Sequence, residues 1–383
     1  MSKVIMIGCD LHDRSMLLRY AVDTGKPQQV SYDNDARGRQ RMIRNLKSLA
    51  KEHQANRIVF AYEASGLGYG LSDLLHEHHI ECHVLSPTHL PKTPKSAKQK
   101  TDARDAQMLL EQVRGFVLAG NSLPVVWTPP HRLRHDRELV RARVDVADEA
   151  TRVKLKVTSM LKRHGITKPT WYTSRWSKRF VKWLREVAAD LDRTVGAVLE
   201  LLIDRHELYK QEQNNLDKAI KQLSQTDRYK APSRKLCSIT GVGILSAMTF
   251  LTEMGDLNRF RNRREVGAYL GLCPASYESG ETNNRKGRIT RQGPSRLRKM
   301  LCQSAWVSII HCKKAAADYH RIKQKQSKRT KKALVAMMRK LGIKMWHVAQ
   351  NCGVSVELAG RGGPHDVMPS GNAQPKGLVS FVR

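Results

Sequence analysis

The sequence predicts an α/β domain followed by mostly helical segments, that is, an α/β plus all-α chain. Up to about residue 118, short apolar runs of strand character alternate with segments of helical period. From residue 131 onward, charged and apolar residues recur at helical spacing instead. With 383 residues, 40% of them hydrophobic, the chain can build more than one core.

The N-terminal part is expected to form a mixed five-stranded sheet. Its first three strands are separated by short polar turns such as 24–26, which indicates antiparallel pairing, and the order continues as helix, strand, helix, strand. This order is typical of a ribonuclease H-like domain. The expected strands are 4–10, 15–22, 28–33, 57–63 and 80–87, and the expected helices are 36–54, 70–79 and one that begins near Thr101.

A basic linker is expected between the last strand and the third helix. Residues 90–100 contain two prolines and four lysines, which favours an exposed segment. The helix after it has an apolar face that suits packing onto the sheet. That face consists of Ala106, Met108, Leu109, Leu110 and Val113.

The helical part divides into an arm and a compact domain. Residues 131–162 and 178–225 predict two long helices that pair as an antiparallel coiled coil or bundle arm, joined by a loop around Pro169. A compact helical domain is expected from about Pro232 to Gly353, and the glycine-rich tail after it is expected to be disordered. The expected domains are therefore 1–125, 126–231 and 232–353, with a tail at 354–383.

The charge of the chain indicates a polyanionic partner. Lysine and arginine number 68 against 35 aspartates and glutamates, giving a net charge of +33. A signal pattern and an apolar run of about eighteen residues are both lacking, so the composition favours nucleic acid over a membrane. The seven cysteines show no CxxC pair and are expected to be reduced thiols in a cytoplasm.

Four carboxylates stand at positions where a site is expected. Asp10 and Glu63 each end an apolar strand, and strand ends are where sites of α/β sheets form. Asp102 and Asp105, three residues apart, lie on one face of the next helix. Such a cluster would repel by about 4 kcal/mol per close pair, so it needs a compensating cation. Oxygen ligands favour Mg²⁺, with Mn²⁺ as the alternative.

A structural interpretation of the same acids stays open. An aspartate at a helix start is usually an N-cap or a first-turn charge, and Asp105 with Arg104 and Lys100 is also compatible with a solvated ion-pair surface. As a set, the four acids favour metal binding. On that interpretation Lys95, Lys98 and Lys100 form a phosphate-binding rim around an anionic, metal-filled centre.

A glycine turn and a cationic stretch follow in the C-terminal part. Residues 236–255 predict a helix, a turn with Gly241 and Gly243, and a second helix. This pattern resembles a phosphate-binding helix-hairpin-helix element, although a tight turn between two helices can hold two glycines for structural reasons alone. Residues 282–317 contain no acid at all. A serine in such a positive field could attack phosphorus. The cations expected to contact nucleic acid here are Arg285, Lys286, Arg288, Arg291, Arg296, Arg298 and Lys299.

The acidic motifs resemble a known family. GCDLH (8–12), YEASG (62–66) and KTDARDA (100–106) are similar to the three parts of the DEDD tetrad in transposases of the insertion-sequence 110 family, whose N-terminal domain is similar to the RuvC junction resolvase. The resemblance implies that Asp10, Glu63, Asp102 and Asp105 are catalytic metal ligands. It covers about residues 3–120 and 232–310.

The C-terminal motifs resemble the same family. GLCPASYESG (271–280) followed by KGRITRQGPSRLRKML (286–301) is similar to its C-terminal transposase domain, in which a serine before a glycine is the nucleophile. Ser279 matches that position, and Ser276 is the alternative. Many relatives have a second serine where this chain has Glu278. Because of this difference, the resemblance leaves both Ser279 and Ser276 as candidates for the nucleophile.

The resemblance implies a DNA recombinase that moves its own insertion sequence through a covalent phosphoserine intermediate. It also implies double-stranded DNA as substrate, a structured guide RNA from the element, a homo-oligomer (dimer or tetramer), and action on nucleoid DNA in a bacterial cytoplasm. Two alternatives remain from the residues: a RuvC-type junction-resolving nuclease in which the acids alone activate water, and a non-enzymatic nucleic-acid-binding protein whose acids form salt bridges.

Overall fold

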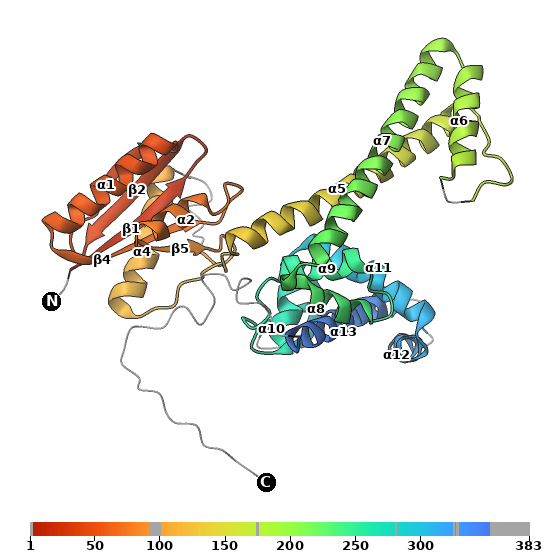
Figure 1. Cartoon of the computed structure of the whole chain (residues 1–383). Helices are drawn as coiled ribbons and strands as arrows, with labels where there is room; N and C mark the ends of the chain where they lie inside the picture. Colours follow the sequence, from red (N-terminus) through yellow and green to blue (C-terminus); the bar gives the residue numbers. More distant parts are fainter. Residues whose placement is uncertain are drawn as a thin grey trace, which may run out of the picture. The chain divides into compact units, whose positions relative to one another are not determined.

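A computed structural model describes most of the chain as two compact units, one up to Pro129 and one from Pro130 onward. Figure 1 shows the helices and strands of both. The described residues are 3–91, 101–173, 176–279, 282–324, 326 and 329–352, with the backbone alone at 276–279 and 282–286.

The first unit contains the predicted mixed sheet, with strand order β3-β2-β1-β4-β5. Strand β1 pairs antiparallel with β2 and parallel with β4, while β5 continues parallel to β4 and β3 antiparallel to β2. The predicted five-stranded sheet is thereby confirmed. The strands are β1 (Lys3–Leu11), β2 (Ser15–Val22), β3 (Gln28–Asp33), β4 (Ala55–Glu63) and β5 (Glu81–Leu85).

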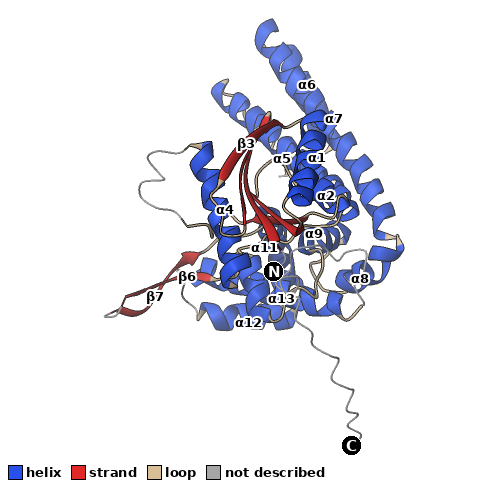
Figure 2. Ribbon diagram, turned by 90° about the vertical axis from the view of Figure 1, so that its left-hand side faces the viewer, coloured by secondary structure: helices blue, strands red, loops and turns tan. Residues whose placement is uncertain are grey.

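Helices cover both faces of this sheet (Figures 1 and 2). Helices α1 (Ala36–Glu52) and α2 (Gly70–Glu77) bury one face together with Ile5, Ile7 and Cys9 of β1. The alternate residues of β1 point to the other face, as the period of a strand requires.

Helix α4 (Asp102–Ala119) packs on that second face. Its predicted apolar residues Ala106, Leu109, Leu110 and Val113 are buried, which confirms the expected packing. Gly8 of β1 lies so close to α4 that an added Cβ would overlap the backbone at Ala106 and Leu110. A side chain at position 8 would therefore force α4 away from the sheet.

The arm consists of three helices, α5 (His131–Arg163), α6 (Lys178–Asp190) and α7 (Arg193–Ser224). Helices α5 and α7 pair as predicted. The expectation of one long helix over 178–225 is wrong, because Asp192 caps a new helix: its carboxylate accepts hydrogen bonds from the amide and hydroxyl of Thr194.

The remainder of the second unit is helical apart from one hairpin, which extends away from the neighbouring helices (Figure 2). Pro232, the expected start of this part, lies inside α8, which begins five residues earlier at Asp227. The elements are α8 (Asp227–Cys237), α9 (Ile244–Met254), α10 (Arg263–Tyr269), β6 (Pro274–Ser279), β7 (Thr282–Ile289), α11 (Ser295–His311), α12 (Lys313–Lys323) and α13 (Thr330–Gln350).

Two further expectations concern the tail and the membrane. The tail predicted to be disordered, 354–383, lies outside the described residues, as does most of the predicted linker, 92–100. Within the described part of the chain, every helix is too short or too polar to cross a bilayer.

Candidate active site

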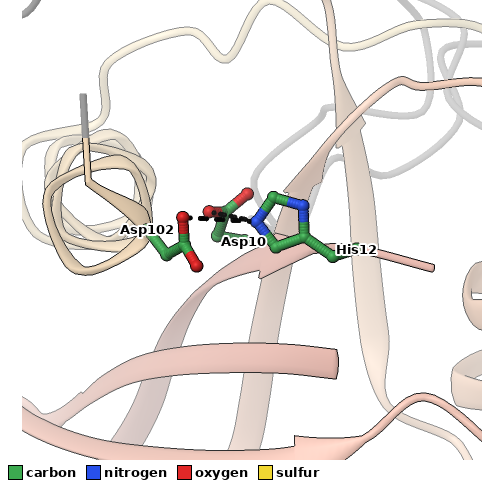
Figure 3. Close-up of side chains that lie close together, drawn as sticks. All are labelled: Asp10, His12 and Asp102. Carbon is green, nitrogen blue, oxygen red and sulfur yellow. Dashed lines mark hydrogen bonds and ion pairs between the residues drawn. The ribbon is translucent and has the colours of Figure 1, made fainter. Parts of the chain in front are cut away.

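Two of the four predicted acids meet at the end of β1, together with a histidine. The Nε2 atom of His12 lies 3.0 Å from an oxygen of Asp10 and 3.4 Å from an oxygen of Asp102. One ligand atom from each of these three residues falls within 4.8 Å of the others (Figure 3). This is the spacing at which three donors can share one metal ion.

The fold brings these residues together from distant parts of the sequence. Asp10 is the penultimate residue of β1, a strand whose backbone is paired on both sides. Asp102 is the first residue of α4, and the contact at Gly8 holds that helix against β1. The N-cap position of α4 belongs to Thr101, so Asp102 is not the N-cap residue.

The charges in this cluster oppose one another. Burial raises the pKa of Asp10, and the carboxylates of Asp102 and Asp105 raise it further, whereas His12 lowers it in part. Burial lowers the pKa of His12, but Asp10 and Asp102 outweigh this effect, so that its pKa is raised overall. The cluster therefore favours a cation, and protonation of His12 can supply one in the metal-free protein.

Glu63 and Asp105 lie near this group without belonging to it. Glu63 ends β4, and because Cys9 pairs with Tyr62 in register, Glu63 follows beside Asp10 on the neighbouring strand. Asp105 contributes to the raised pKa of Asp10. Among the described residues, the close three-atom group contains neither of these two carboxylates.

His12 was not among the predicted site residues, although the sequence contains a signal for it. It stands two residues after Asp10, and residues two apart on a strand share one face. A short turn fixes its backbone, because the His12 amide donates to the carbonyl of Ser15 and its carbonyl accepts from the Asn34 side chain. His12 lines an open cleft whose walls are formed by residues 11–15 and 65–67.

The serine segment forms a β-hairpin of β6 and β7. Ser279 is the last residue of β6 and pairs with Thr282, while Ser276 pairs with Lys286. The side chains of both serines lie outside the described part of the structure, as do those of Arg285 and Lys286. The backbone therefore places Ser279 beside the hairpin turn and Ser276 farther along the strand.

The predicted cations near this hairpin have different surroundings. Arg288 and Arg291 are exposed, whereas Arg298 donates to the carbonyl of Gly293 at 2.7 Å. Arg296 pairs with Asp145 of α5 at 2.7 Å, and Lys299 pairs with Asp148 of the same helix. Exposed ion pairs of this kind contribute about 0–1 kcal/mol, so a phosphate could replace either carboxylate at small cost.

The lysines of the predicted phosphate-binding rim cannot be placed. Lys95, Lys98 and Lys100 all lie outside the described residues. They precede Asp102 directly in the sequence, so their assignment to nucleic acid stays a prediction.

The two glycines of the α8–α9 turn have different structural roles. Gly241 has a φ of +90°, and an added Cβ would overlap the carbonyl of Ser304 in α11. Gly243 occupies the N-cap position of α9, where an added Cβ would meet no atom within 4 Å. Gly241 is thus required for packing, while Gly243 leaves the start of α9 uncovered.

Comparison with known proteins agrees with the sequence motifs and the sheet. Residues 7–166 match the family DEDD_Tnp_IS110, described as a transposase, and residues 233–321 match the family described as Transposase IS116/IS110/IS902 family. The described sheet, with an acid at the end of its first strand, is consistent with the ribonuclease H-like fold of DEDD transposases.

Curated relatives carry transposase names. The Sinorhizobium fredii transposase y4qE is 30% identical over 285 residues, covering 74% of this chain and 67% of the relative. The transposase for insertion sequence element IS1533 of Leptospira borgpetersenii is 25% identical, covering 80% of this chain and 86% of the relative. The transposase for IS1111A of Coxiella burnetii is 26% identical over 238 residues, which is 61% of each chain. Two segments of the chain match family models, and the alignment with y4qE covers most of both proteins. This chain therefore belongs to the IS116/IS110/IS902 family of transposases.

Proposed function

We propose that this transposase cuts and rejoins DNA with two catalytic elements, the acidic centre of the first unit and the serine hairpin of the second unit, the acidic centre of one subunit acting with the serine of another. The convergence of Asp10, His12 and Asp102 at the end of β1 carries the proposal. Two carboxylates and an imidazole fit a divalent metal, and burial together with the neighbouring carboxylates raises the pKa of Asp10, an effect that a bound cation would offset.

We propose Asp10 and Asp102 as metal ligands, with Glu63 and Asp105 completing the acidic tetrad around them. A bound Mg²⁺ or Mn²⁺ would stabilise negative charge on the phosphate under attack. His12 adds a nitrogen donor, which suits Mn²⁺ better than Mg²⁺. In the metal-free protein the same imidazole holds the two carboxylates together.

Ser279 is proposed as the nucleophile. Its hydroxyl oxygen would form a bond to phosphorus, while the bond from phosphorus to the leaving strand breaks and that strand departs as a hydroxyl carrying the serine proton. The reverse attack by another strand's hydroxyl would release the serine and join the strands. The exposed Arg288 and Arg291 would stabilise the charge that develops on phosphorus.

Recognition of the DNA is proposed to depend on an element-encoded structured RNA and on a homo-oligomer, a dimer or tetramer. The charge of +33 suits a protein that holds several polyanions at once. The open start of α9 at Gly243, together with Gly241, is proposed as a helix-hairpin-helix contact to phosphates without sequence readout. We also propose three functional domains, 1–125, 126–231 and 232–353.

The test is a search for a covalent protein–DNA adduct. Purified protein is incubated with Mg²⁺ or Mn²⁺, element-end DNA and element-derived RNA, and adducts are mapped by mass spectrometry. We expect an adduct on Ser279, none in Ser279→Ala, and an undiminished adduct in the matched control Ser276→Ala. An adduct on Ser276 would move the nucleophile, and metal-dependent cutting without any adduct would favour the junction-resolving nuclease.

The RNA requirement needs a separate arm of that experiment. Protein freed of nucleic acid by nuclease treatment is expected to bind DNA weakly and without sequence preference, and to recombine only after the RNA is added. Site-specific recombination by RNA-free protein would contradict this part of the proposal and would require a protein reader of sequence.

A further inference from the structure

The connection between α5 and α6 carries an unbalanced positive charge. From 151 to 185 the sequence contains no aspartate or glutamate. Its described residues belong to the last part of α5, the connection after it and the first part of α6, at one end of the arm (Figure 1). We call it the basic patch of the arm. Its described cations, apart from Arg152 and Arg185 at its two ends, which pair with carboxylates, are Lys154, Lys156, Lys162, Arg163, Lys168, Lys178, Arg179 and Lys182.

Two arginines of the arm are paired with carboxylates. Arg185 contacts Glu200, Asp204 and Glu207, and Arg143 forms a two-point pair with Asp217. Within the described residues, the ion pairs of the patch lie toward its ends: Arg152 with Glu149, Lys182 with Glu186 at 4.0 Å, and Arg185 with its three acids. The exposed lysines of the patch at 156, 162 and 178 have no carboxylate within ion-pair distance in the described structure.

Aromatic rings hold several of these cations in place. The Arg179 guanidinium lies 4.1 Å from the centre of the Trp171 ring, and the Lys168 ammonium lies 4.7 Å from that of Tyr172. Tyr172 and Trp176 in turn pack against the buried ring of Phe180. The ring surfaces are thus occupied by cations and by one another, which leaves charge rather than open ring faces for a partner.

The inner part of the patch is also positive. Burial, and then the charge of Lys210 on α7, lower the pKa of Lys154. Burial, and then the charges of Lys154 and Lys210, lower the pKa of His206 to about 4. His206 is therefore neutral near pH 7 and adds no charge. Lys178 stands in the first turn of α6, where the helix dipole favours acidic side chains, so its positive charge is not stabilised by the helix.

We propose that the basic patch of the arm binds the sugar-phosphate backbone of a double-helical nucleic acid. Fixed cations without acidic partners suit regularly spaced phosphates. Half-buried tryptophan and tyrosine rings, stacked on cations, do not suit insertion into a membrane. The proposal goes beyond the catalytic function proposed above and does not depend on Ser279 or on a guide RNA.

The test compares two variants of the full chain that lose the same charge. In the patch variant, Lys156, Lys162 and Lys178 become glutamine; in the control variant, Lys218, Lys221 and Lys230 become glutamine. All six lysines are exposed. Binding is measured by fluorescence anisotropy with an RNA duplex and a DNA duplex of equal length over a range of salt concentrations. Circular dichroism confirms that both variants fold.

The patch variant is expected to bind at least about tenfold more weakly near physiological salt, with a log-log salt slope reduced by about 2 to 3 on DNA. The control variant is expected to lose less than about threefold. A larger loss on one duplex identifies RNA or DNA as the partner. Equal losses in both variants, or none in either, would overturn the proposal. Binding to phosphatidylserine vesicles that only the patch variant loses, with duplex binding unchanged, would assign the patch to a membrane instead.

Discussion

Replacing Asp10 with asparagine in the metal-free protein is expected to change the stability in opposite directions at low and high pH. His12 lies between Asp10 and Asp102, at 3.0 and 3.4 Å. When His12 is protonated, Asp10→Asn removes an attraction between opposite charges. When His12 is neutral, the same substitution removes only the repulsion between two carboxylates and the cost of burying one of them.

The sizes follow from the distances. At an effective dielectric of 20, opposite charges 3.0 Å apart attract by about 5.5 kcal/mol, and like charges within 4.8 Å repel by at least about 3.5 kcal/mol. The side chains of His12 and Asp102 are 48% and 59% exposed, so solvent screening weakens both interactions. Exposed pairs contribute about 0–1 kcal/mol in practice, and we expect changes of about 0.5–1 kcal/mol in each direction.

The direction with pH follows from the raised pKa of His12. Because this pKa is higher in the folded than in the unfolded protein, the ion-pair stabilisation is fully present below the ordinary histidine value and is lost as pH rises through the folded value. The assay is urea unfolding with a chelator from about pH 5.5 to about pH 9. Asp10→Asn should be less stable than wild type at the low end and more stable at the high end.

A His12→Asn background is the control for this prediction. Without the imidazole, Asp10→Asn should stabilise the protein across the whole range, because only the repulsion and burial of the carboxylates remain. A loss of stability that is equal at all pH values, or a crossover that persists in the His12→Asn background, would refute the reasoning.

Three further predictions follow from the site and its surroundings. Glu63→Gln should abolish recombination in a plasmid assay while leaving the urea midpoint nearly unchanged; a folded, active variant would exclude Glu63 from the tetrad. Gly241→Ala should cost about 1–3 kcal/mol in unfolding free energy, because position 241 combines a positive φ with a close approach to α11, whereas Gly243→Ala should cost far less. Arg288→Gln and Arg291→Gln should each lower the log-log salt slope of DNA binding by about 0.9, and an unchanged slope would show that these arginines do not contact phosphates.

The sheet could be predicted from the sequence because its signals are local. The apolar runs at 4–10 and 57–63 and the turn at 24–26 fall within the observed strands and hairpin. The arm was predicted less well, since the apolar period continues through Asp192 with little interruption. Two contacts in the structure reveal that a new helix begins there: the Asp192 carboxylate caps it through Thr194, and the backbone at Gly196 packs closely against the carbonyl of Ala188 in α6.

The acidic centre could be predicted in part. Asp10 and Glu63 follow from their places at strand ends, and the apolar face of the next helix predicts that Asp102 and Asp105 lie over the same sheet. How closely Asp102 approaches Asp10 depends on a contact between segments far apart in sequence. The cause is one glycine: without a side chain at Gly8, α4 lies directly on β1 and its first residue reaches the end of that strand. Spacing within a motif does not encode such a contact.

His12 illustrates the opposite case, in which a local signal was present but concerned a different residue type. The sequence argument selected carboxylates, because four acids near many lysines suggested an oxygen-ligated metal. The strand period places residue 12 on the same face as residue 10, and the turn back into β2 fixes it there through Ser15 and Asn34. An imidazole between two carboxylates neutralises them when protonated and can act as a nitrogen ligand when neutral. The metal-free and metal-bound centres can therefore use the same three side chains, and metal binding should become tighter as pH rises, because the proton on His12 must leave first.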